Sequence, residues 1–151
     1  MHDPQIEHDF AQSWDRVWHF YEDVSYSFAP KAQEMITDMR VQGYDKAIRA
    51  GTALFTLVLS KSRIHGDHYG HPHLVFDFHK SRSDFQFPEI DWPDDFVFPD
   101  GRMVVHNCIE GREQETIHTF PEVKLTTEVD ALLQALAAKP VYYPGERIDP
   151  R

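Results

Sequence analysis

The spacing of hydrophobic residues changes twice along this chain of 151 residues. They recur every three or four positions up to about residue 39, alternate with polar residues in stretches between about residues 52 and 120, and return to helical spacing after residue 127. The first spacing indicates amphipathic helices, and alternation indicates half-buried strands. Because the strands follow one another without intervening helices, the pattern argues against a doubly wound parallel sheet and favours an α+β fold.

Two helices are predicted at the N-terminus. The first covers residues 4–25, with Asp3 as its cap and Pro4 at its first position. The second begins near Pro30 and ends at Gly43, with apolar residues facing inward. We expect the aromatic stripe of the first helix to lie in the core, and the alternative is a homodimer seam. The stripe consists of Phe10, Trp14, Trp18 and Tyr21.

The alternating stretches predict the sheet. Strands are expected over about residues 52–61, 73–79, 103–109 and 116–120, with Gly111 in the loop joining the last two. Residues 44–63 also fit a helix, but Gly51 and Thr52 weaken that interpretation. A final helix is predicted to begin with Thr127 as its cap and to stop before Pro140.

These elements predict the overall organisation of the chain. We expect one α+β domain over residues 1–151, with a loosely held tail from about residue 140. The domain would have two N-terminal helices, a largely antiparallel sheet of about four to five strands, and a C-terminal helix packed on one sheet face.

Negative charge is concentrated in one segment. The net charge is −10, and residues 84–101 hold six carboxylates and no cation, together with five aromatic rings and three prolines. Such a segment suits a basic macromolecule, and we expect a partner-binding surface centred on Asp91, Trp92, Asp94 and Asp95. The alternative is that its phenylalanines are inward residues of two strands joined by a turn at Trp92-Pro93, with solvated acids outside. They are Phe85, Phe87, Phe96 and Phe98.

A histidine cluster between residues 65 and 79 suggests a second hypothesis. His71 and His73 would share one face of a strand, with Cα atoms roughly 7 Å apart, close enough to share a divalent transition metal ion. A catalytic site would need a distant third ligand, for which His106 and His118 are candidates. The favoured interpretation is a polar loop that leads into the solvated face of a strand, and no cofactor is expected.

No recognised catalytic motif accompanies these residues. The sequence has no nucleophile elbow and no glycine-rich phosphate loop. Cys108 lies two residues after His106 but among apolar neighbours, which favours an inert buried thiol. A lone cysteine and the lack of a signal peptide or an apolar membrane span predict a cytoplasmic protein.

The sequence therefore favours a non-catalytic acidic interaction protein that binds a basic protein partner. Bacterial immunity and antitoxin proteins that neutralise cationic nucleases have this general character.

The acidic charge argues against nucleic acid as a partner, and the sequence has no polybasic patch that would suggest binding to a membrane surface. A homodimer is a further possibility. A basic segment would pair with the acidic one within the fold or across a symmetric interface, and the favoured alternative is that its cations are scattered and solvated. They are Lys46, Arg49, Lys61 and Arg63. The alternative function is a small metal-dependent enzyme or metal-binding domain.

Overall fold

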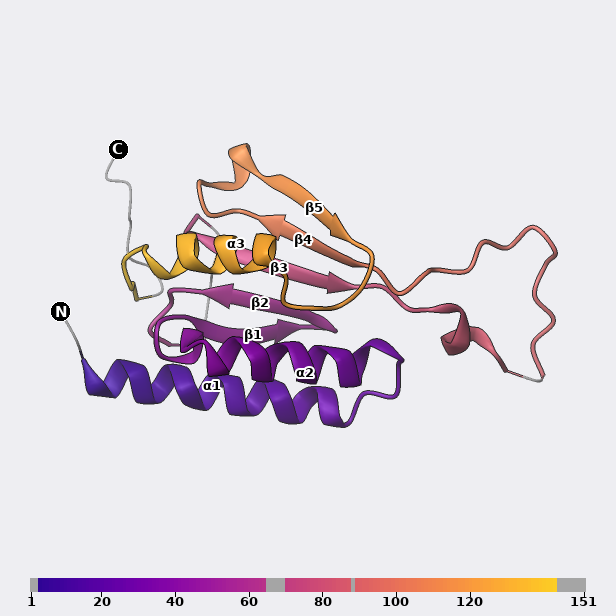
Figure 1. The fold of residues 1–151 in the computed structure, drawn as a ribbon, viewed down its shortest axis with the longest axis horizontal. Helices are drawn as coiled ribbons and strands as arrows, with labels where there is room; N and C mark the ends of the chain where they lie inside the picture. The colour runs from indigo at the N-terminus through magenta and orange to yellow at the C-terminus, as the bar shows by residue number, and fades with distance from the viewer. Residues whose placement is uncertain (1–2, 65–69, 88, 144–151) are drawn as a thin grey trace.

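The computed structural model describes residues 3–64, 70–87 and 89–143, and it has the α+β architecture that the sequence predicts (Figure 1). Its α-helices are α1 (Pro4–Glu22), α2 (Phe28–Val41) and α3 (Thr127–Ala137). Its strands are β1 (Arg49–Ala53), β2 (Thr56–Ser60), β3 (His73–Phe78), β4 (Met103–Asn107) and β5 (Thr116–Phe120). Three short 3-10 helices are η1 (Tyr44–Lys46), η2 (Arg82–Phe85) and η3 (Arg112–Gln114).

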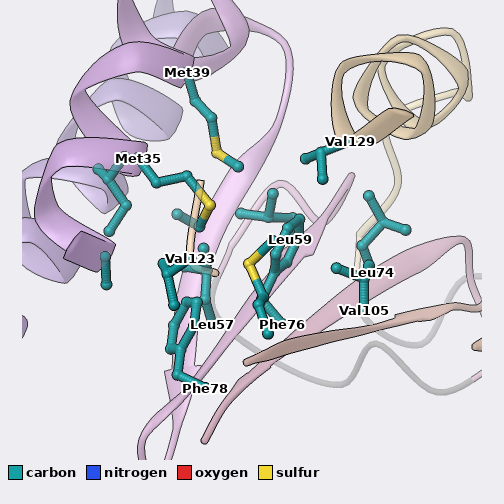
Figure 2. Packing of buried hydrophobic residues seen from close by; sticks show 14 of the residues in the cluster. Met35, Met39, Leu57, Leu59, Leu74, Phe76, Phe78, Val105, Val123 and Val129 are labelled. Atoms are coloured by element: carbon teal, nitrogen blue, oxygen red, sulfur yellow. The ribbon is translucent and has the colours of Figure 1, made fainter. Parts of the chain in front are cut away.

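The strands form one antiparallel sheet in the order β1-β2-β3-β4-β5. Alternation turns one set of side chains toward the helices, where they are buried with residues of α1, α2 and α3 (Figure 2). This inward set is Leu57, Leu59, Leu74, Phe76, Phe78, Met103 and Val105. The other sheet face carries half-exposed residues such as Val58, Val75 and Val104. The predicted packing of the C-terminal helix on one sheet face is confirmed.

The first helix follows its sequence signals closely. The Asp3 carboxylate accepts a hydrogen bond of 2.9 Å from the Gln5 backbone N–H, and Pro4 occupies the first turn. The helix ends at Glu22, three residues before the predicted boundary. Phe10, Trp14 and Tyr21 are at most 1% exposed, so this part of the stripe lies in the core and not on a dimer surface.

The region between α2 and β3 differs from its prediction. A single strand over about residues 52–61 was expected, but the chain forms a hairpin of β1 and β2 that turns at Leu54 and Phe55. Leu54 has a φ of 56° and is 89% exposed. Leucine is not one of the residue types typical of turns, so the sequence does not mark this turn. The predicted cap of the last helix is also displaced by one residue, because Thr126 accepts the hydrogen bond from the Val129 N–H at 3.1 Å.

The described part of the tail is attached to the sheet end. The Tyr142 N–H donates to the Lys61 carbonyl at 3.0 Å, and the Arg63 N–H donates to the Tyr142 carbonyl at 2.7 Å. The Tyr142 side chain is 2% exposed. A loosely held tail was expected from about residue 140. Tyr142 contacts the sheet end, and residues 144–151 of that tail lie outside the described part.

Candidate interaction surface

The connection between β3 and β4, residues 79–102, projects from the end of the sheet, and we call it the acidic arm (Figure 1). Its two ends are joined at a narrow neck. The His79 N–H donates to the Arg102 carbonyl and the Gly101 N–H donates to the Lys80 carbonyl, each at 3.0 Å. These bonds continue the pairing of β3 with β4, so the arm starts from a defined point of the sheet.

The described residues of the arm contain no β-strand, and their one regular element is η2. The interpretation of the phenylalanines as inward residues of two strands, joined by a turn at Trp92-Pro93, is therefore wrong. The reason is that the rings of Phe85, Phe96 and Phe98 pack on one another within the arm and do not alternate across a sheet, while Phe87 is exposed.

An aromatic cluster gives the arm a small core of its own. Its members are Phe85, Trp92, Phe96 and Phe98, and the ring centroids of every pair lie between 4.8 and 5.9 Å apart. The Trp92 indole N–H donates to the Phe85 carbonyl at 2.7 Å. The four rings are half-buried, so the cluster is shielded only in part. Trp92 thus supports the arm and still presents part of its indole to solvent.

Asp84 attaches the arm to the body of the protein. Its carboxylate accepts hydrogen bonds from the Ser27 N–H and hydroxyl, both at 2.7 Å, and from the Ser81 N–H at 2.8 Å. Burial alone would raise the pKa of Asp84, but these hydrogen bonds and the charge of Lys80 outweigh it, so the pKa is lowered. The Lys80 ammonium also lies 4.1 Å from the Tyr26 ring centroid. Asp84 is therefore a structural carboxylate.

A second carboxylate of the segment is paired at the neck. Asp100 receives two hydrogen bonds from the Arg102 guanidinium, at 2.7 and 2.6 Å. Hydrogen bonding from Arg102 lowers the pKa of Asp100 to about 2, and its charge contributes further. Two of the six predicted acids thus serve the arm itself.

The other four acids are exposed, and none forms an ion pair with any residue that the structure describes. They are Glu89, Asp91, Asp94 and Asp95. The two cations on the arm outside the neck pair, Lys80 and Arg82, lie against aromatic rings, with the Arg82 guanidinium 4.5 Å from the Phe98 centroid. Because the described cations do not neutralise these four carboxylates, their negative electrostatic field extends into solvent.

Exposed apolar side chains lie between these acids. Val97 is 87% exposed, Phe87 49% and Ile90 45%. Asp91, Trp92, Asp94 and Asp95, which were predicted to share one surface, all lie on the arm, whereas Ile90 and Val97 were not predicted as contact residues. The alternation of aromatic and polar residues in this segment also fits buried strands, so it does not indicate which apolar side chains are exposed.

The histidines of the metal hypothesis are buried. His73 is 3% exposed, and its Nδ1 lies 2.8 Å from the His71 carbonyl oxygen. The His71 ring stacks on Tyr142 with centroids 3.7 Å apart, and its Nδ1 has no hydrogen-bond partner within the described ranges. Among the described residues, no three metal-binding side chains come together. His65 and His68 lie outside the described part.

The proposed distant ligands are paired with carboxylates. His106 Nδ1 lies 3.1 Å from a Glu115 oxygen, and His118 Nδ1 lies 3.0 Å from a Glu128 oxygen. Cys108 is buried, with its Sγ 3.4 Å from the other Glu115 oxygen. Burial raises the pKa of the Cys108 thiol to about 11, and Glu115 adds to the effect. A thiol that stays protonated at neutral pH is a poor nucleophile.

The basic segment lies apart from the acidic arm. The Lys61 ammonium is buried and donates to the carbonyls of Ala47 and Ala137, at 2.5 and 3.0 Å. The Arg63 guanidinium lies 3.9 Å from the Asp3 carboxylate and 4.1 Å from the Tyr143 ring centroid. None of the four cations pairs with an acid of the arm among the residues that are described. The predicted pairing within the fold is therefore not observed.

Comparisons with known proteins give no match: no family model, no curated protein and no solved structure is similar to the chain. In the described ranges, no helix has both the length and the apolar character needed to cross a membrane.

Proposed function

We propose that the protein is a non-catalytic binding protein whose acidic arm docks onto a basic protein partner. The observation that carries this proposal is the arm itself, a projecting loop on which four carboxylates lack cationic partners in the described structure. A cationic toxin nuclease neutralised by an immunity or antitoxin protein is one partner of the required charge.

Two physical effects support this function. The field of Glu89, Asp91, Asp94 and Asp95 attracts a cationic surface and accelerates encounter, most strongly at low ionic strength. Contact would then involve the exposed part of Trp92 together with the apolar side chains between the acids, because a few buried residues, Trp prominent among them, carry most of the binding energy of an interface.

The arm is also organised before binding. Its aromatic cluster, the Asp84 hydrogen bonds and the paired neck restrict its conformations in the free protein. A loop that is already ordered loses less conformational entropy on association than a flexible one. This supports a rigid docking element over a segment that folds on its partner.

The test is affinity capture from native lysate at low salt, with quantitative mass spectrometry of the eluted proteins. The arm variant carries Asp91→Asn, Asp94→Asn and Asp95→Asn. A matched control carries Asp23→Asn, Glu34→Gln and Asp38→Asn, exposed acids near α1 and α2, so both lose three negative charges. We expect a basic protein to be captured by wild type and control but reduced about tenfold or more by the arm variant.

Kinetics with the captured partner give the sharper measurement. The arm variant should associate more slowly, and its association rate should depend less on salt, whereas the control should resemble wild type. Equal capture by the arm variant and the control, or a partner without basic character, would contradict the proposal.

The metal-dependent alternative has weaker support. His71 and His73 are both buried, and the Nδ1 atoms of the other two candidate ligands face carboxylates.

A further inference from the structure

A cavity opens at the end of the sheet opposite the acidic arm. Its volume is about 710 Å³, and its wall comes from residues 70–72 before β3, residues 109–114 after β4 and residues 139–140 after α3. The arm leaves the opposite ends of β3 and β4, so the cavity is separate from the surface proposed above (Figure 1). A cavity of this size can hold a small organic molecule.

One wall residue, His71, has an unsatisfied buried nitrogen. His71 is 9% exposed, and its Nδ1 has no hydrogen-bond partner in the part of the chain that the structure describes. Its ring is held in place by Tyr142, on which it stacks with ring planes 7° apart. Buried polar atoms are nearly always paired, so an orphaned one needs an explanation, and a bound molecule is one. Because His71 forms part of the cavity wall, a ligand is placed to supply the missing partner.

The loop on one side of the cavity is ordered by its own hydrogen bonds. The Cys108 N–H donates to the His73 carbonyl at 3.0 Å, which fixes the start of the loop beside β3. The Gln114 N–H donates to the Gly111 carbonyl at 3.1 Å. Gly111 has a φ of 107°, a conformation that glycine adopts without strain. A ligand that enters this cavity therefore has little backbone to order.

The charged side chains of the wall balance one another. They are two carboxylates and two cations, Glu110, Glu113, Arg112 and Lys139. The Lys139 ammonium lies 3.3 Å from the Glu110 carboxylate, and Arg112 is also engaged in an interaction of its own. An ionic ligand of either sign would meet wall groups of its own sign. The wall thus offers hydrogen-bond donors and acceptors to a ligand without net charge.

We propose that this cavity binds a neutral, hydroxyl-rich ligand, namely a sugar ring with neighbouring hydroxyl groups. A hydroxyl both donates and accepts, so it can pair with His71 Nδ1 in either tautomer of the imidazole. The two oxygens of the Glu113 carboxylate can accept hydrogen bonds from adjacent hydroxyls, and the Gln114 amide can donate and accept. Pro72 and Pro140 add apolar surface for the C–H groups of the ring. A free saccharide and the ribose of a nucleoside share this chemistry.

The test is titration of the ¹⁵N-labelled full chain with glucose, maltose, adenosine and uridine, followed by amide chemical shifts. We expect saturable shifts at Gly70, Gly111 and Gln114 with at least one of these probes, and a dissociation constant below about 10 mM. The charged analogues glucose 6-phosphate, glucosamine and uridine monophosphate should bind at least about threefold more weakly than their neutral parents. Binding of the saccharides alone would identify a saccharide site, and binding of the nucleosides alone would identify recognition of ribose.

Variants of the wall locate the binding. His71→Phe keeps a ring against Tyr142 but removes both nitrogens, and it should weaken binding about tenfold. Glu113→Gln, at an exposed position where the fold tolerates change, should weaken binding several-fold. The matched controls are His19→Phe on α1 and Glu34→Gln on α2, both at exposed positions outside the cavity, and they should bind as wild type does.

Three outcomes would contradict this inference. Absence of saturable shifts with every neutral probe at about 10 mM would overturn it. Binding that survives both His71→Phe and Glu113→Gln would also overturn it, because the ligand would then lie elsewhere. A charged analogue that binds more tightly than its neutral parent would overturn the assignment of a neutral ligand.

Discussion

The protein contains two tryptophans in comparable local settings, one in the body and one in the acidic arm. Each indole N–H donates to a backbone carbonyl, Trp14 to Ile48 and Trp92 to Phe85. Trp14 is fully buried and its acceptor lies 34 residues away, whereas Trp92 is half-buried and its acceptor lies seven residues away. The body is therefore held by contacts between distant segments, and the arm mainly by contacts within itself.

This difference implies that global stability and arm shape can be changed separately. Long-range contacts in a buried core belong to the cooperative unfolding unit, whereas a locally stabilised loop can open without unfolding the domain. Binding residues on such a loop can vary at little cost to the fold.

The largest expected effect is a change in the free energy of unfolding when one ring is removed from the body, compared with one removed from the arm. Phe76→Ala removes a fully buried ring from the sheet and should lower the free energy of unfolding by about 3–5 kcal/mol. Trp92→Ala in the arm should lower it by less than about 1 kcal/mol, because the arm contributes little to the core. Urea denaturation followed by circular dichroism measures both. A comparable loss for the two variants would show that arm and body unfold as one unit.

Lys61 provides the next comparison, between a charge inside the body and charges on the arm. Burial lowers the pKa of Lys61 from 10.5 to about 8. Between these pH values the unfolded chain binds more protons than the folded one, so this residue makes stability rise with pH across that window and leaves it constant below. Relative to Lys61→Met, the free energy of unfolding of wild type should increase by on the order of 1–2 kcal/mol between pH 7.5 and about 9.5.

Denaturation of both proteins at each pH isolates this contribution, because other groups titrate equally in the two. Asp94→Asn serves as the arm control, and its stability difference from wild type should not vary over the same pH range, because the carboxylate is exposed. A constant difference between wild type and Lys61→Met would mean that the buried ammonium keeps its ordinary pKa.

The smallest expected effect on global stability concerns the attachment of the arm. Asp84→Asn removes the charge that accepts hydrogen bonds from Ser27 and Ser81. We expect about tenfold faster amide exchange at Ser27 and Ser81, with a loss of less than about 1 kcal/mol in unfolding free energy. Because the pKa of Asp84 is lowered, wild type should keep this protection above pH 3.8 and lose it as the pH falls through the lowered pKa. Unchanged exchange at both amides would argue against anchoring by Asp84.

Much of the fold could be predicted because its signals are local. The cap at Asp3, the proline after it and the helical spacing that follows define α1 nearly to its ends. The alternation around β3 and β5 gives these strands within one residue. The hairpin of β1 and β2 was missed because Leu54 adopts a left-handed conformation that turn sequences normally assign to glycine or asparagine.

The arm could be located from its composition, but its conformation could not. Charge and aromatic content single out residues 84–101 without any structural information. The packing of Phe85 on Trp92 and Phe96, and the attachment of Asp84 to Ser27, join residues whose proximity has no periodic signature. The sequence alone therefore does not distinguish the carboxylates that hold the arm in place from those that are available for binding.

The narrow neck has a consequence for how this protein can diversify. Because His79 and Lys80 lie beside Arg102 and Gly101, the chain enters and leaves the arm at nearly the same place. Insertions, deletions or a wholesale exchange of the intervening segment can then leave the strand register undisturbed, since lengthening a surface loop adds little closure entropy. Related proteins could carry loops of quite different length and charge on the same sheet, and a short turn grafted across the neck should yield a folded protein without this appendage.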